Sequence, residues 1–207
     1  MTAFTIEDRP LLRLLWLMTG LVGFGFSLAL IVIADIGLPP WDVFHQGVSE
    51  QLGWSLGTSV VVTSGFVLLL WIPIRERPGI GTIANAIVVG VVLDLSLAVL
   101  PDDVDSMAAR IALLLGGILL NGFTTGFYIG AGLGPGPRDG LMTGIAKKGP
   151  SIRLVRTSIE VTVLTIGALL GGGFGVGTVL FALSIGPLAQ IFIPRLSLDR
   201  AASPSEQ

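Results

Sequence analysis

The sequence predicts an all-α polytopic membrane protein, with six transmembrane helices arranged as two inverted three-helix repeats. Of its 207 residues, 52% are hydrophobic and only 13% are charged, about half the charged fraction of an ordinary soluble domain. Six apolar stretches approach the roughly 20 residues that a helix needs to cross a bilayer. In addition, the second half of the chain repeats the residue spacing of the first half.

The six predicted spans cover residues 14–34, 56–74, 80–100, 111–133, 154–170 and 176–193. Helices are expected because a lipid-facing strand would leave backbone hydrogen-bonding groups unpaired. The first span has 21 residues, which exceeds the core of about 7–15 residues in a signal peptide. We therefore expect it to be retained as a helix of the protein.

Basic residues are distributed unevenly over the predicted connections. Of the twelve Lys and Arg residues, only Arg110 lies on the side that holds the connections after the first, third and fifth spans. The positive-inside rule therefore predicts that both termini are cytoplasmic. Residues 1–207 are expected to form a single membrane domain, with cytoplasmic tails at 1–10 and 198–207.

The internal repeat becomes visible when the chain is shifted by 97 residues. Arg13 then aligns with Arg110, and Asp42 with Asp139; further on, at an offset of 96, a Gly-Thr pair at 81–82 aligns with one at 177–178. Repeat one covers about 11–100 and repeat two about 108–196. Because each repeat holds three spans, the second copy must enter the membrane from the opposite side, as in many secondary transporters. A duplication kept only for packing is the alternative interpretation.

A Gly/Pro break and a short helical segment follow the first span of each repeat. The breaks are Gly-Leu-Pro-Pro-Trp-Asp at 37–42 and Gly-Pro-Gly-Pro-Arg-Asp at 134–139. Interrupted segments at matching positions indicate the binding site of a transporter, because helix N-termini and freed backbone groups face it. We expect Asp42 and Asp139 to bind a cation or a proton, or Arg138 to bind an anion. Alternatively, both aspartates only cap their helices, and the short helices are either re-entrant or interfacial.

Three further charged residues fall inside predicted spans. Arg156 and Glu160 are four residues apart, a spacing that lets them pair on one helix face. They form either a structural ion pair or part of a substrate or coupling site. Asp94 is either a neutral structural group or a titrating carboxylate used in proton coupling. Asn85 and Asn121 are expected to form interhelical hydrogen bonds.

Composition also excludes several classes of protein. The net charge of −2 provides no basic surface for nucleic acid. The chain has no cysteine and one histidine, His45, so we expect no metal site and no cofactor. A lone histidine on a short helix is more often structural than catalytic. No nucleophile–base set is evident, so no enzyme activity and no catalytic residues are expected.

Several segments together resemble the YczE-like bacterial integral membrane proteins, which are grouped with the YyaS and YitT proteins. They are the motifs at 39–43, 136–142 and 175–178, the Arg156–Glu160 pair and the Gly-Pro pair at 186–187. The resemblance covers about 11–196. It implies a multi-pass protein of the bacterial cytoplasmic (inner) membrane and supplies no substrate.

The function expected from these observations is that of a small secondary transporter or permease-like protein. Its site would lie at the repeat interface, and its substrate would be an unknown small molecule or ion. The alternative is a non-transporting membrane partner or regulator of another complex. Lipid surrounds the protein in either case, and a homo-oligomer or a membrane partner protein is compatible with both.

Overall fold

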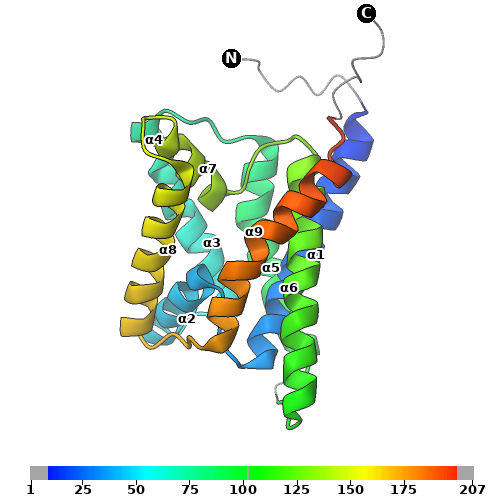
Figure 1. The fold of residues 1–207 in the computed structure, drawn as a ribbon, viewed down its shortest axis with the longest axis vertical. Coiled ribbons are helices and arrows are strands. Elements are labelled where there is room, and N and C mark those ends of the chain that lie inside the picture. The colour runs from blue at the N-terminus through cyan, green and yellow to red at the C-terminus, as the bar shows by residue number, and fades with distance from the viewer. Residues whose placement is uncertain (1–8, 102, 200–207) are drawn as a thin grey trace, which may run out of the picture.

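The computed structural model describes residues 9–101 and 103–199, and these residues form nine helices and no strand (Figure 1). The helices are α1 (Pro10–Ala34), α2 (Pro40–Leu52), α3 (Leu56–Leu69), α4 (Trp71–Ile74), α5 (Ile80–Val99), α6 (Met107–Gly130), α7 (Pro137–Ala146), α8 (Ile152–Leu169) and α9 (Val176–Leu196). The all-α prediction is confirmed for this part of the chain. Most of the predicted tails, at 1–10 and 198–207, lies outside the described residues.

Five segments are long and apolar enough to cross a membrane: α1, α3 together with α4, α5, α6 and α9. These correspond to five of the six predicted spans. The remaining one, α8, has 18 residues but includes Arg153, Arg156 and Glu160. Because of these charges, length and composition do not identify α8 as a span, and the sixth span stays a prediction.

The helices α1 and α6 pack along each other, on the right of the view in Figure 1. Their backbones approach closely because glycine lies at the contacts. A methyl group on Gly20 would lie 2.5 Å from the backbone nitrogen of Tyr128, and one on Gly117 would lie 2.7 Å from the Ile31 side chain. Small residues at contacts are typical of helix packing in membranes. Helix α5 then packs on α1, and α9 on α6.

The two short helices that the breaks predicted are α2 and α7, and they lie at opposite ends of the bundle (Figure 1). Each packs against helices of the other half of the chain: α2 on α8, and α7 on α3 and α4. At the first contact, a methyl group on Gly47 would lie 2.6 Å from the carbonyl oxygen of Gly167. At the second, the Trp71 indole covers Gly140 and donates Nε1–H to the carbonyl oxygen of Pro137 at 3.0 Å.

The loop that leads into α7 is held by the first residues of α5. The backbone N–H of Gly81 donates to the carbonyl oxygen of Leu133 at 2.8 Å. The Thr82 hydroxyl donates to the carbonyl oxygen of Pro135, also at 2.8 Å. The start of α7 is therefore anchored to a helix of the first half.

The loop that leads into α2 is held in a corresponding way by the first residues of α9. The backbone N–H of Gly177 donates to the carbonyl oxygen of Ile36 at 3.0 Å. In both loops the chain turns at a glycine with a positive φ, 121° at Gly37 and 116° at Gly134. Residues with a side chain rarely adopt this conformation, so each turn depends on its glycine.

Helices α3 and α5 are in close contact through Gly57 and Gly90. A methyl group on Gly90 would lie 2.5 Å from the carbonyl oxygen of Gly57. Beside this contact, the Asp94 carboxylate accepts hydrogen bonds from the backbone N–H of Gly57 at 2.7 Å and from the Ser55 hydroxyl. Asp94 thus fixes the start of α3 against α5.

We predict that Gly90→Leu destabilises the protein by about 1–3 kcal/mol, the usual cost of overpacking, because α3 leaves no room for the side chain. The matched control is Gly65→Leu on α3, where a methyl group would meet no atom within 4 Å. The free energy of unfolding in detergent, followed by Trp fluorescence, measures both. Equal stability of the two variants would contradict the close contact.

Candidate functional site

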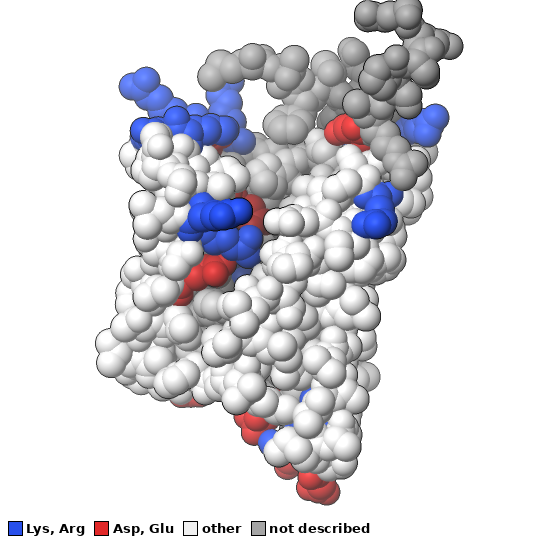
Figure 2. Space-filling model, in the orientation of Figure 1, with Lys and Arg blue, Asp and Glu red and all other residues white. Residues whose placement is uncertain are grey.

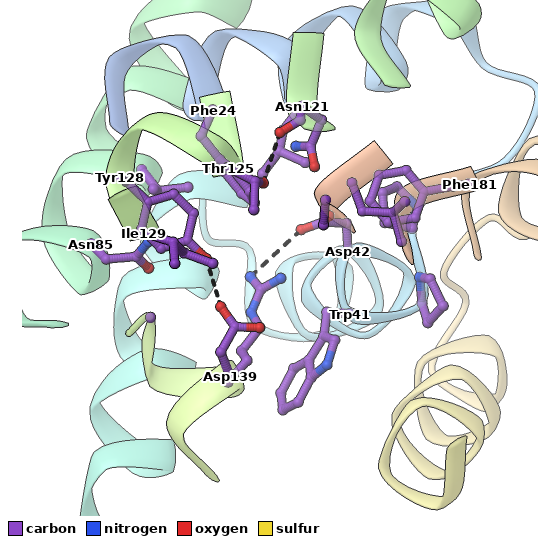
Figure 3. A pocket seen from close by; sticks show the side chains of 18 of the residues that line it. Phe24, Trp41, Asp42, Asn85, Asn121, Thr125, Tyr128, Ile129, Asp139 and Phe181 are labelled. Atoms are coloured by element: carbon purple, nitrogen blue, oxygen red, sulfur yellow. Dashed lines mark hydrogen bonds and ion pairs between the residues drawn. The ribbon is translucent and has the colours of Figure 1, made fainter. Parts of the chain in front are cut away.

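A cavity of about 200 Å³ lies where the first turns of α2 and α7 meet (Figure 3). Every helix except α4 contributes to its lining. The polar and charged side chains around it are Asp42, Ser64, Asn85, Asn121, Thr125, Tyr128, Arg138, Asp139, Arg156 and Glu160. The cavity therefore lies inside the bundle and combines residues from both halves of the chain.

Both short helices begin with proline, at Pro40 and Pro137. Proline suits the first helical position, because the N–H that it lacks would have no partner within the helix. It also shifts the aspartates into the first turn, so that the N-cap residues are Pro39 and Gly136 and no side chain caps either helix. The capping interpretation of the aspartates is therefore wrong. Their carboxylates remain close to the positive end of the helix dipole.

The Asp42 side chain is only 2% exposed and borders the cavity. Its Oδ1 lies 3.0 Å, a hydrogen-bond distance, from Nδ1 of the fully buried His45. Its Oδ2 has no hydrogen-bond partner among the described residues. A buried carboxylate oxygen without a partner is costly, so Asp42 retains an acceptor position for a ligand or a proton.

Arg138 links the two short helices. Its Nη2 lies 3.9 Å from Oδ1 of Asp42 (Figure 3) and 3.4 Å from Nδ1 of His45. The guanidinium also stacks over Trp41, at 5.2 Å from the ring centroid. A cation of α7 is therefore held by a carboxylate and an aromatic ring of α2.

Asp139 has a different partner. Its Oδ2 accepts a hydrogen bond of 2.6 Å from the hydroxyl of Tyr128 (Figure 3). Tyr128 is buried on α6 and is the only tyrosine in the chain. The two aspartates thus occupy corresponding positions on their helices but lie in different environments.

The predicted pairing of Arg156 with Glu160 is confirmed. Nε of Arg156 donates to Oε1 of Glu160 at 2.8 Å, and the side chains are 44% and 23% exposed. Both border the cavity from α8. Three carboxylates and two guanidinium groups therefore surround it, a formal charge of −1.

The structure brings together five of the six predicted site residues: Asp42, Arg138, Asp139, Arg156 and Glu160. Asp94 does not border the cavity and instead bonds to the start of α3. Among the described residues, no group of three His, Asp or Glu side chains could hold a metal ion.

Sequence reasoning missed several of the lining residues. It did not single out Tyr128, although a lone tyrosine within an apolar span was a usable signal. Ser64 and Thr125 gave no signal, because such residues are common in membrane helices. The interhelical role expected of Asn121 is confirmed, since its Nδ2 donates to the Ser27 hydroxyl at 2.9 Å.

We predict that Asp42 and Arg138 are energetically coupled across the two short helices. Arg138→Gln should destabilise the protein more in the presence of Asp42 than in Asp42→Asn, because it leaves a buried carboxylate without its cation. A double-mutant cycle on the free energy of unfolding should give a coupling of about 1–3 kcal/mol. The exposed pair of Lys147 and Glu76, which are 2.6 Å apart, serves as a control with at most about 1 kcal/mol. Additive effects of Asp42→Asn and Arg138→Gln would contradict the coupling.

Comparison with known proteins shows the relationships of the chain. The family model described as a family of unknown function (DUF6198) matches residues 11–194. An uncharacterized protein of Haemophilus influenzae is 42% identical over 170 residues, which cover 82% of this chain and 78% of that protein. No solved structure matches the chain.

Two proteins of Bacillus subtilis are also similar. The uncharacterized membrane protein YczE is 31% identical over 193 residues, covering 92% of this chain and 89% of YczE. The uncharacterized protein YyaS is 24% identical over 181 residues, covering 84% and 89%. The family model, which matches residues 11–194, includes both short helices and all the residues that line the cavity. The chain therefore belongs to the DUF6198 family and is a YczE-like membrane protein.

Proposed function

We propose that the protein is a small secondary transporter of the bacterial cytoplasmic membrane, and that its substrate binds in the cavity between α2 and α7. The observation that carries this proposal is the meeting of two charged helix N-termini, one from each half, at a single cavity. Broken helices whose N-termini face a central site are a recurrent feature of transporters.

Equivalent positions of the two predicted repeats line this cavity. At an offset of 97 the lining pairs are Phe24 with Asn121, Leu28 with Thr125, Trp41 with Arg138, and Asp42 with Asp139; at 96 they are Val60 with Arg156, Ser64 with Glu160, Asn85 with Phe181, and Val89 with Ile185. An inverted repeat accounts for this pairing, because its two copies would face each other across the cavity. The second copy supplies most of the charge.

The contacts of the short helices support the same relationship. A methyl group on Gly47 would lie 2.7 Å from the side chain of Leu170, and one on Gly144 would lie 2.7 Å from that of Ile74. These two contacts are equivalent under the offsets of 97 and 96. We therefore treat α2 and α7 as re-entrant half-helices that enter from opposite sides of the membrane.

Helix α8 serves as the sixth span in this proposal. Its two deeper charges, Arg156 and Glu160, pair with each other and border the cavity. Arg153 lies in the first turn of α8, where a long side chain reaches the membrane surface. With α8 included, the basic connections lie on one side and both termini are cytoplasmic.

The charge of the site suits a coupled transporter. The formal charge of −1 and the buried Oδ2 of Asp42, which has no hydrogen-bond partner among the described residues, favour the binding of one proton or one cation, which would neutralise the cavity. Loading the site in this way reduces the cost of holding charge in the apolar bundle. Asp42 is thus the proposed group that binds the proton or the cation, including a cationic group of the substrate, and the arginines and Asp139 that line the cavity take part in substrate binding.

Accessibility of single cysteines tests the proposal, because the chain has no cysteine of its own. Ser64→Cys and Thr125→Cys place a thiol at buried cavity positions. If the cavity opens alternately, a membrane-impermeant maleimide should label both from either face, in intact cells and in inverted vesicles. Controls at Asp103→Cys and Lys147→Cys, both exposed, should label from the outer and the inner face only. Labelling of both cavity cysteines from a single face would overturn transport and favour a non-transporting partner.

A further inference from the structure

The cavity is not closed on the side between α8 and α9. In the first half, Gly57 of α3 covers Gly90 of α5, the close contact described above. Gly186 of α9 lies 96 positions after Gly90, and a methyl group there would meet no atom within 4 Å. Since Arg153 occupies the position equivalent to Gly57, the close approach of α3 to α5 has no counterpart between α8 and α9.

The opening exposes charged groups on the side of the bundle. Figure 2 views the molecule across the helices and shows Lys or Arg and Asp or Glu side chains in a hollow between α8 and α9, within a largely uncharged face. The charged residues that border the cavity from α7 and α8 are Arg138, Asp139, Arg156 and Glu160. Helices α8 and α9 also expose large apolar side chains, among them Leu154 and Leu183. In a membrane, this face contacts lipid, so the hollow opens toward lipid.

The two walls of the opening differ in polarity. The α9 wall is apolar and consists of Phe181, Ile185, Ala189 and Ile193, whereas the α7 and α8 wall is charged. A ligand that satisfies both walls has a charged head and an apolar tail. A small polar solute would leave the apolar wall uncovered.

The charged residues also indicate where the positive and negative groups of such a ligand's head would lie. Asp42 lines the cavity, and its buried Oδ2 lacks a hydrogen-bond donor among the described residues, which an ammonium group would supply. On α8, Arg156 uses Nε on Glu160, and the described residues offer no hydrogen-bond partner to its terminal nitrogens. Arginine binds phosphate through such paired nitrogens.

We propose that the ligand of this site is a zwitterionic phospholipid with a primary amine, which enters sideways between α8 and α9. Its ammonium lies at Asp42, its phosphate at Arg156, and its acyl chains extend along α9 past Gly186. The claim that this lipid is the transported substrate rests on the proposed function. The claim that it binds here rests on the cavity alone.

Lipid retention tests the proposal. The purified protein is equilibrated with vesicles of equal parts phosphatidylethanolamine, phosphatidylcholine and phosphatidylglycerol, and the lipids that remain bound are counted by native mass spectrometry. We expect phosphatidylethanolamine to be enriched by roughly tenfold over the other two, because only its head donates an N–H to a carboxylate and also carries a phosphate. Asp42→Asn should remove this preference, and Arg156→Gln should weaken the retention of all three lipids.

A variant that changes no charged group provides a second test in case Asp42→Asn or Arg156→Gln does not fold. Gly186→Leu adds a side chain on α9 beside the proposed opening, at a position where a methyl group would meet no atom within 4 Å, and it also favours the helix. We expect it to lose the bound lipid. The matched control is Gly65→Leu, again a substitution into open space, which should retain the lipid.

Other outcomes overturn the proposal. Equal retention of the three lipids excludes recognition of the amine. Glycerophosphoethanolamine carries the same head group but no acyl chains. If it displaces phosphatidylethanolamine as well as the intact lipid does, the ligand is a water-soluble zwitterion and not a lipid. Alternating cysteine labelling without lipid preference overturns the lipid assignment and leaves transport standing. A lipid preference with labelling from one face supports the lipid site and overturns transport.

Discussion

Charged side chains are costly in an apolar interior unless they find partners of opposite charge or hydrogen-bond donors, and this requirement governs how α2 and α7 meet. Both helices begin inside the bundle, where their first turns carry Asp42, Arg138 and Asp139. Arg138 forms an ion pair with Asp42 from the other helix, and Tyr128 donates a hydrogen bond to Asp139. Glycine-rich loops, anchored to α5 and α9, hold the two starts in place. Without these partners, the chain could not begin two helices at this depth.

Local spacing was sufficient to predict the short helices and the Arg156–Glu160 pair, because both depend on residues close together in the chain. The role of Asp94 could not be predicted in this way, since its partners Ser55 and Gly57 lie at the start of another helix. The capping interpretation failed for a local reason: proline at the first helical position moved each aspartate to the third. Sequence also could not show that Tyr128 reaches Asp139, because that contact depends on how α6 and α7 are placed.

The two halves of the chain share their spacing but differ in chemistry at the cavity. Trp41 in the first half corresponds to Arg138 in the second, and Val60 to Arg156. Packing residues also differ between equivalent positions. Trp71 covers Gly140 of α7, whereas Gly167, the residue equivalent to Trp71, lies directly against the backbone of α2. Because matching sequence positions carry unequal side chains, the cavity has an apolar wall and a charged wall, which a perfectly symmetric dimer of one half could not form.

The exchange of short helices between the halves has a consequence for biogenesis. Because α2 packs on α8 and its preceding loop is held by α9, the first half leaves the ribosome before the surfaces that cover α2 exist. Gly47 contacts Gly167, which is synthesised 120 residues later. During that interval the nascent chain holds Asp42 and His45 without their final surroundings. Helix α2 therefore acquires its full packing only after α8 and α9 have been made, and we expect neither half to fold by itself.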